Sequence, residues 1–233
     1  MCIRVSLSAD DQDSVRLLTV QNLVAMAEVL SPAETQQLLL SSICGAFQDK
    51  SWRVRYMAAD NFVQLATAVG EDVVKEDLVP AYINLMRDAE AEVRTAAATQ
   101  LPGLAKLLDQ NTIIERLLPV AKELADDPSQ HVRGALAAQV SALAPLLGKD
   151  ATTEHLLPLF LQLLKDEFPE VRLNIISRLE QVNEVIGIDL LSQSLLPAIM
   201  TLAEDKQWRV RQAIIENLSL IHISEPTRPL YIS

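Results

Sequence analysis

The stretch Asp49-Lys50-Ser51-Trp52-Arg53-Val54-Arg55 is one copy of a pattern in which an aspartate precedes a Val-Arg pair. The next copy begins at Asp88, 39 residues later (88 − 49), and the same spacing separates all neighbouring copies. The aspartates and their arginines are Asp10 and Arg16, Asp49 and Arg55, Asp88 and Arg94, Asp127 and Arg133, Asp166 and Arg172, and Asp205 and Arg211. A fixed period of about 20–50 residues is typical of proteins built from stacked repeats. The sequence therefore predicts a solenoid.

The residues after each aspartate predict a helix. In the second copy, Val54, Ala58, Phe62, Leu65 and Val69 are spaced by four, four, three and four residues, which places them on one stripe of a helix. We call this helix B, and we call the apolar helix that precedes the aspartate helix A. Such a pair cannot bury both faces alone, so stacking on its neighbours completes the core. The predicted fold class is all-α, an α-solenoid of stacked antiparallel helix pairs.

Proline and glycine mark the expected ends of these helices. Near the start of helix A, where first-turn amides have no acceptor to lose, prolines recur. These are Pro80, Pro119, Pro158 and Pro197. Glycines follow helix B, where a left-handed cap is expected. These are Gly70, Gly148 and Gly187. Pro102-Gly103 falls inside the third helix B, which predicts a kink or a break there.

The repeat pattern sets the expected domain organisation. We expect one repeat array over residues 1–218, about five and a half repeats with the first and last incomplete. Beyond it, Glu225 replaces an expected apolar residue, and Pro226 and Pro229 prevent a helix from continuing. We interpret residues 219–233 as a tail foreign to the repeat, disordered or loosely attached.

Composition and charge limit the classes of function. The chain has 233 residues, 49% of them hydrophobic and only 4% aromatic, which favours a core of Leu, Val, Ile and Ala. A net charge of −11 disfavours binding to nucleic acid or to an anionic membrane surface. No apolar run reaches the roughly 18 residues of a membrane span. Two cysteines, Cys2 and Cys44, indicate a reducing compartment. We expect a cytoplasmic protein, with the nucleus as a second compartment.

Residues that carry chemistry do not form a catalytic pattern. His131, His155 and His222 have no cysteine or second histidine at ligand spacing, so we expect neither a metal nor a cofactor. The six glycines are scattered and form no phosphate-binding loop. We predict that the chain is not an enzyme and has no catalytic residues.

The recurring aspartates and arginines allow two interpretations. In the structural one, the carboxylate accepts amides at the start of helix B, and the arginine of one repeat pairs with the aspartate of the next. The pairs would then form a ladder along one edge of the stack. As exposed pairs they would contribute about 0–1 kcal/mol each and would set stacking geometry more than stability. In the alternative, these residues face a binding partner.

The turn between helices A and B is the expected partner-binding surface. Trp52-Arg53 and Trp208-Arg209 occupy this turn in two copies, and Trp and Arg are the residues that most often anchor interfaces. The alternative is that each indole folds over its own helix pair. We predict partner contacts at the matching positions of five copies, namely Trp52, Arg53, Glu92, His131, Glu170, Trp208 and Arg209.

These copies, with Leu-Pro in helix A and Asp-x-x-x-x-Val-Arg before helix B, resemble HEAT repeats. Longer strings resemble the scaffold (regulatory A) subunit family of protein phosphatase type 2A, among them Asp49 to Met57, Glu154 to Phe160 and Pro169 to Ile176. The resemblance covers roughly residues 6–218. Members of that family carry a longer array, so the resemblance implies an internal fragment with neither natural end.

The resemblance implies a non-catalytic scaffold whose turns dock regulatory B subunits in the earlier part of the array and the phosphatase catalytic subunit in the later part. Trp52 and Arg53 lie in a turn that resembles one used for regulatory subunits. Trp208 and Arg209 lie in a turn that resembles the first repeat that binds the catalytic subunit.

A second function remains open at this point, that of a transport or trafficking adaptor that binds peptides on a concave face of B helices. A polar row supports it, formed by Asn22, Asn61, Gln100, Gln139 and Asn217 and interrupted by Arg178.

Overall fold

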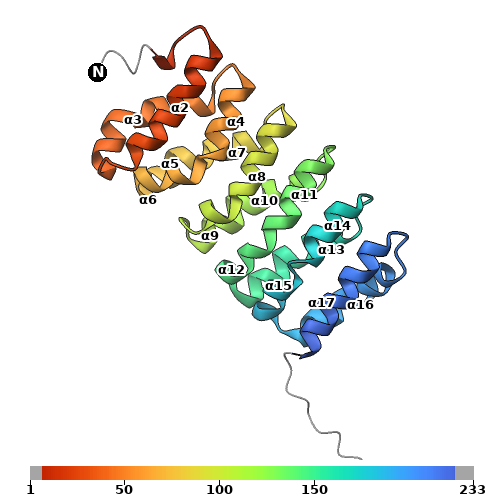
Figure 1. The fold of residues 1–233 in the computed structure, drawn as a ribbon. Helices are drawn as coiled ribbons and strands as arrows, with labels where there is room; N and C mark the ends of the chain where they lie inside the picture. The colour runs from red at the N-terminus through yellow and green to blue at the C-terminus, as the bar shows by residue number, and fades with distance from the viewer. Residues whose placement is uncertain (1–6, 224–233) are drawn as a thin grey trace, which may run out of the picture. The chain divides into compact units, whose positions relative to one another are not determined.

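The structure of the protein, a computed structural model, describes residues 7–223, and the side chains of these residues except at positions 188, 192, 196 and 218–223. All regular secondary structure in this part is helical (Figure 1). The chain divides into two compact units, Met1–Gln139 and Val140–Ser233. The division falls inside the fourth helix B.

The first unit contains two layers of helices. Its elements are α2 (Asp13–Ala27), α3 (Pro32–Phe47), α4 (Trp52–Asp60), α5 (Phe62–Val69), α6 (Glu71–Val73), the π-helical η1 (Val74–Leu78), α7 (Val79–Met86), α8 (Ala91–Ala105), α9 (Gln110–Thr112), the π-helical η2 (Ile113–Leu117), α10 (Leu118–Ala125) and α11 (Gln130–Gln139). The B helices α2, α4, α8 and α11 lie side by side, and the A helices α3, α7 and α10 form the second layer (Figure 1).

The second unit repeats this arrangement. Its elements are the 3₁₀-helical η3 (Val140–Leu143), α12 (Ala144–Ala151), the π-helical η4 (Thr152–Leu156), α13 (Leu157–Leu164), α14 (Pro169–Ile176), α15 (Leu179–Ile186), α16 (Ile188–Ala203) and α17 (Trp208–Ile223). Helix α14 packs on α17 in the B layer, and α13 packs on α16 in the A layer. Stacked pairs of helices confirm the predicted fold class.

The predicted stripe of helix B forms the core. Val54, Ala58, Phe62, Leu65 and Val69 are each at most 1% exposed. The aromatic rings of Phe62 and Tyr82 pack at a tilt of 58° with their centroids 4.8 Å apart, and the Tyr82 hydroxyl donates a hydrogen bond of 2.6 Å to the carbonyl of Ala97. Burial raises the pKa of Tyr82 well above its usual value. The core is therefore aliphatic, with one satisfied polar group at its aromatic centre.

Helix A has a recurring irregularity that the sequence did not reveal. Pro80, Pro119 and Pro158 occupy the second position of α7, α10 and α13, and a π-helical turn precedes each of these helices. Proline has no N–H and crowds the carbonyl four residues earlier, so a wider turn lets the helix continue through it. The expectation that Pro197 also stands near the start of helix A is wrong, because it lies inside α16.

The predicted break at Pro102-Gly103 is wrong, because α8 is continuous from Ala91 to Ala105. The B helix α2 is also continuous, whereas other B helices are interrupted, for example between α4 and α5. Gly103 instead allows a close approach, since a Cβ added there would lie 2.7 Å from a methyl of Val63 on α5. Pro102, which has no N–H to donate within α8, therefore stands next to the glycine that allows close packing on the neighbouring repeat.

The glycines after helix B adopt positive φ, as expected, but they do not form left-handed helical caps. Gly70, Gly148 and Gly187 have φ of 73–86° and ψ of 156–179°. That extended region is open essentially to glycine alone. The chain therefore leaves helix B abruptly and enters the next helix A directly.

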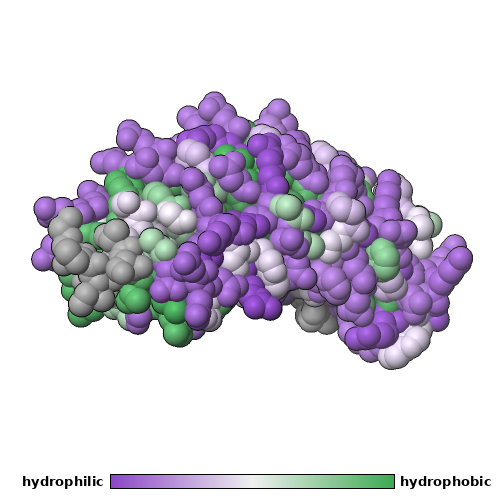
Figure 2. All heavy atoms as spheres, turned by 90° about the horizontal axis from the view of Figure 1, so that it is seen from above, coloured by the Kyte–Doolittle hydropathy of each residue, from purple (hydrophilic) through white to green (hydrophobic). Residues whose placement is uncertain are grey.

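The helix α17 continues to Ile223, beyond the boundary expected at Leu218. Residues 224–233 lie outside the described residues, so the separate tail over 219–233 stays a prediction. On the face shown in Figure 2, hydrophilic residues cover most of the surface and hydrophobic patches are separate. None of the helices among residues 7–223 is both long and apolar enough to cross a membrane.

Candidate functional site

Each repeat aspartate orders the turn that opens helix B. The carboxylate of Asp49 accepts the amide N–H of Ser51 at 2.8 Å, and that of Asp88 accepts the amide of Glu90 at 3.0 Å. Equivalent bonds occur in the other four copies. Ser51 and Glu90 are the residues that flank the first turn of α4 and α8. The aspartate therefore fixes the residue before the helix rather than capping the helix directly.

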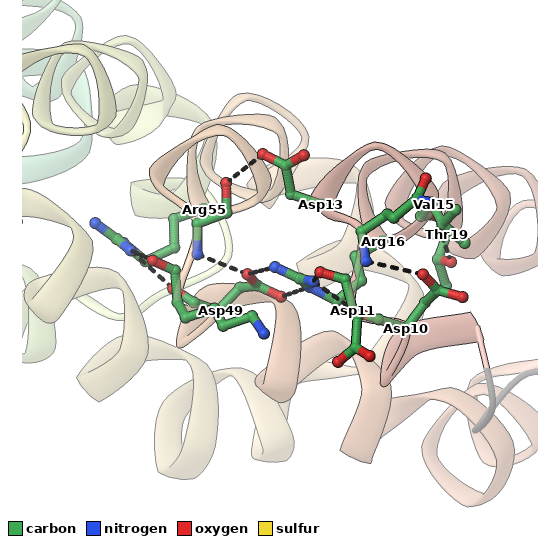
Figure 3. Close-up of polar contacts among 11 residues, drawn as sticks. Asp10, Asp11, Asp13, Val15, Arg16, Thr19, Asp49 and Arg55 are labelled. Carbon is green, nitrogen blue, oxygen red and sulfur yellow. Dashed lines mark hydrogen bonds and ion pairs between the residues drawn. The ribbon is translucent and has the colours of Figure 1, made fainter.

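Each repeat arginine holds the turn of its own repeat. Arg16 Nη1 donates to the backbone carbonyl of Asp10 at 2.7 Å (Figure 3). The same bond, 2.6–2.7 Å long, occurs at Arg55, Arg94, Arg133, Arg172 and Arg211. A cation in the first turn of a helix is disfavoured by the helix dipole, and these carbonyls offset that effect.

The same arginines reach the aspartate of the following repeat. Arg16 Nε and Nη2 donate to the two carboxylate oxygens of Asp49 at 2.8 and 2.9 Å (Figure 3). Arg55 binds Asp88 in the same bidentate way, at 2.6 and 2.9 Å. Two further pairs follow in register, Arg94 with Asp127 and Arg172 with Asp205. Arg133 and Asp166 lie in different units.

One rung of this ladder differs from the others. Arg172 Nη2 lies 3.0 Å from each carboxylate oxygen of Asp205, and its buried Nε has no hydrogen-bond partner. In the three complete rungs of the first unit, Nε donates to the aspartate at 2.6–2.8 Å. The joint between α14 and α17 is therefore held less completely than those of the first unit.

The rungs are more buried than the sequence led us to expect. The side chains of Arg55 and Asp88 are only 18% and 9% exposed, so the description as exposed surface pairs is wrong. Burial alone would raise the pKa of Asp88, but the Arg55 guanidinium and the Glu90 amide outweigh burial and lower that pKa. The pKa of Asp49 is lowered in the same way by Arg16 and Ser51, against its own burial. The arginine and the aspartate of a rung both lie near the start of a B helix. When neighbouring repeats stack, these helix starts pack together and remove both charges from water.

The turn at Trp52 presents an aromatic anchor. Trp52 is the first residue of α4 and is 38% exposed, and the Arg53 guanidinium lies 5.8 Å from its ring centroid. Arg53 Nη1 is also 4.0 Å from the Asp13 carboxylate. Tyr56, one helical turn further, is equally exposed. Tyr56 was not among the predicted contact residues, although its spacing of four residues from Trp52 places both on one face of a helix.

The turn at Trp208 brings three of the predicted residues together. Trp208 begins α17 and is 62% exposed, and Arg209 Nη1 lies 3.4 Å from the Glu170 carboxylate on α14. These three residues line a groove of about 440 Å³ between α14 and α17, with Leu173 and Asn174 also in its wall. The indole is thus available to a partner, next to a polar groove.

The remaining predicted anchors are single exposed residues. Glu92 and His131 are each the second residue of a B helix, α8 and α11. Neither forms an ion pair within the part of the chain that the structure describes. Among residues 7–223, no group of three or more His, Cys, Asp or Glu side chains is placed to hold a metal ion.

Comparison with known families identifies the repeat. A family model described as PPP2R1A-like HEAT repeat matches residues 71–148, and models of HEAT repeats match residues 39–69 and 156–229. Together these matches cover more than half of the chain. The chain is a HEAT-repeat protein. The last match extends past Leu218, the predicted end of the array.

This HEAT-repeat protein is 59% identical over 49 residues to the A-type regulatory subunit of protein phosphatase PP2A from Schizosaccharomyces pombe. The aligned stretch spans 21% of this chain and 8% of that relative's length. The match is therefore local.

Solved structures resemble the HEAT-repeat protein in fold alone. A designed armadillo repeat protein in complex with the peptide (KR)4 has a TM-score of 0.61 and 19% identity, over 94% of this chain and 97% of its own. Cex1p has a TM-score of 0.72 and 17% identity, over 92% of this chain and 41% of its own.

Proposed function

We propose that this chain is a non-catalytic scaffold of a protein phosphatase type 2A assembly, which docks regulatory B subunits and the catalytic subunit through the turns between helices A and B. The observation that carries the proposal is the pair of exposed Trp-Arg turns, at Trp52 and at Trp208, each at the start of a B helix.

Three features support this proposal. Exposed tryptophans beside arginines are the side chains that most often contribute strongly to protein interfaces. The ladder holds the turns in a fixed spacing, so that several can contact one partner at the same time. The local identity to an A-type phosphatase regulatory subunit and the match to a PPP2R1A-like repeat favour this class of partner over others.

The experiment measures binding of purified regulatory B subunits and of the catalytic subunit to the full chain and to two variants. Trp52→Ala is expected to weaken the binding of regulatory B subunits by about 30-fold or more, as for an interface anchor. Trp208→Ala is expected to weaken the binding of the catalytic subunit by a similar factor. Circular dichroism should show unchanged helical content, because both indoles are exposed.

Matched controls come from the A helices. Leu38→Ala and Met200→Ala remove comparably exposed apolar side chains that lie away from the turns, and both should leave binding unchanged. If the tryptophan variants bind both subunit types as tightly as the parent chain does, the anchor assignment is wrong.

A peptide-binding adaptor is the second candidate function. The groove between α14 and α17 favours it, because Glu170, Asn174 and Glu216 in its wall could receive a basic, extended segment.

Two members of the predicted polar row, Asn61 and Asn217, each donate from the side-chain amide to the carbonyl four residues earlier. Gln100 donates instead to the carbonyl of Asp60 in the neighbouring repeat.

Calorimetric titration with an alternating Lys-Arg octapeptide separates the two candidates. An adaptor should bind it saturably and lose affinity in Glu216→Gln, with Trp52→Ala unaffected. A phosphatase scaffold should show only weak binding that disappears as salt is raised.

A further inference from the structure

A pocket of about 700 Å³ lies on the A-helix side of the second unit, separate from the exposed tryptophans. Its floor is apolar, formed by Leu161 and Leu164 of α13 and by Ala198 and Leu202 of α16. A volume of this size is typical of sites that bury a ligand or several side chains of a peptide. The pocket thus offers an unfilled apolar surface between two A helices.

One of the two equivalent joints of the first unit, that between α7 and α10, is bridged by a half-exposed ion pair. Arg87, at the end of α7, donates to both carboxylate oxygens of Glu123 on α10, at 2.7 and 2.6 Å. Two periods further along the chain, Lys165 takes the position of Arg87 and Thr201 takes that of Glu123. Both residues line the pocket. Threonine cannot supply the carboxylate, and Lys165 has no ion pair within the described residues.

The incomplete rung lies in the wall of the same pocket. Arg172 is more than nine-tenths buried, it lines the pocket, and its Nε has no acceptor. An orphaned buried donor is costly, so its presence indicates a joint that its own residues do not complete. The absent ion pair between α13 and α16 and the incomplete rung between α14 and α17 are independent observations on the same two neighbouring repeats.

The charges on the rim restrict the ligand. Lys165 and Lys206 are accompanied by Glu167 and Glu204, so a long anionic chain would meet repulsion as well as attraction. A single carboxylate beside Lys165 meets a cation that faces the neutral Thr201 at the position where Glu123 pairs with Arg87. An aliphatic side chain next to that carboxylate would cover the leucine floor.

We propose that the pocket between α13 and α16 binds a segment of a partner protein in which an aliphatic side chain stands next to a carboxylate. The aliphatic group rests on Leu161, Leu164 and Ala198, and the carboxylate pairs with Lys165, as Glu123 does with Arg87 in the first unit. The proposal does not depend on the phosphatase role. The rim of the pocket includes Glu167 and Lys206 of the turns between helices A and B, whereas its apolar floor belongs to the A helices α13 and α16.

The test uses the full chain with methyl groups labelled for NMR and the blocked peptide acetyl-Ala-Leu-Glu-Ala-amide as the probe. Saturable shifts are expected at the methyls of Leu161, Leu164 and Ala198. Replacing the peptide's leucine by alanine should weaken binding by about tenfold or more, because the buried apolar area is lost. Replacing its glutamate by glutamine should weaken binding by about two- to fivefold, as for a partly exposed ion pair.

Thr201→Glu supplies a carboxylate from within the chain that competes for Lys165. This variant should weaken peptide binding at least about threefold. Asn84→Glu is the matched control, since it makes the same change in charge at the same repeat position of α7, and it should leave binding unchanged. Absence of saturable shifts, or equal binding to the parent and to Thr201→Glu, would falsify the proposal. Hexanoate binding at these methyls while the peptide does not bind would also overturn it, by identifying a free aliphatic acid as the occupant.

Discussion

At the residue scale, one aspartate serves two repeats. Asp49 holds the Ser51 amide of its own turn and the guanidinium of Arg16 from the preceding repeat. Arg16 in turn holds the carbonyl of Asp10. Turn geometry and stacking therefore depend on the same few atoms, which explains why both residue types recur together.

Asp88→Asn should destabilise the protein by about 2–3 kcal/mol. Asparagine can still accept the Glu90 amide, but it leaves the largely buried Arg55 guanidinium without its counter-charge. Urea unfolding followed by circular dichroism measures the change. Glu115→Gln, at an exposed carboxylate, is the control and should change the midpoint little; a similar midpoint for both variants would contradict the ladder's contribution to stability.

Stability should fall in acid because of these aspartates. The pKa of Asp49 and of Asp88 is lower in the folded state than the ordinary value near 3.8, so their contribution is fully present above about pH 4. It is lost as the pH falls through the depressed folded-state pKa. Melting temperatures measured between pH 7 and pH 3 should therefore drop for the parent chain and drop less for Asp88→Asn. Parallel curves would show that Asp88 does not contribute to the acid sensitivity.

At the element scale, the 39-residue period predicts which positions of helix B are buried, but not where the helices bend. The stripe from Val54 to Val69 is buried as its spacing requires. The π-helical turns before Pro80 and its equivalents depend on how the preceding residues pack, which a proline alone does not specify. Pro102 illustrates the same limit, since it interrupts neither α8 nor its packing.

Two helical glycines should respond in opposite ways to alanine. Gly45→Ala on α3 meets no atom within 4 Å, so it should stabilise the protein by about 0.5–1 kcal/mol through helix propensity. Gly103→Ala should destabilise it by about 1–2 kcal/mol, because the new methyl would overlap Val63. Thermal unfolding measures both changes. Val63→Ala should reduce the cost of Gly103→Ala in the double variant; additive effects would contradict the close approach.

At the scale of the whole molecule, the sequence predicts the stacked helical fold, and it favours exposure of both tryptophans because a turn between helices offers little apolar surface to cover an indole. It does not predict the burial of the rungs or the pocket between α13 and α16. Those depend on which residues meet across neighbouring repeats, for example Lys165 with Thr201 rather than Arg87 with Glu123. The position of a residue within its own repeat does not determine which side chain it faces in the next repeat.

Damage to the core should remain local, because each repeat contacts its neighbours only. Ile175→Ala removes a fully buried side chain of α14 and should cost about 2–5 kcal/mol. Hydrogen exchange should accelerate in α13, α14 and α17, while α2 and α4 in the other unit keep their protection. Uniform acceleration along the chain would indicate a single cooperative unit instead.

The ladder also has a consequence for changes in chain length. Each arginine of a complete rung finds its aspartate 33 residues ahead. An in-frame deletion of residues 50–88, one whole period, would put Arg94 where Arg55 stands and leave Asp127 within its reach. A deletion of any other size there would shift the two members of a rung out of step. The array can therefore be shortened or lengthened in whole modules, and splicing or recombination that respects this unit should yield a chain that still folds.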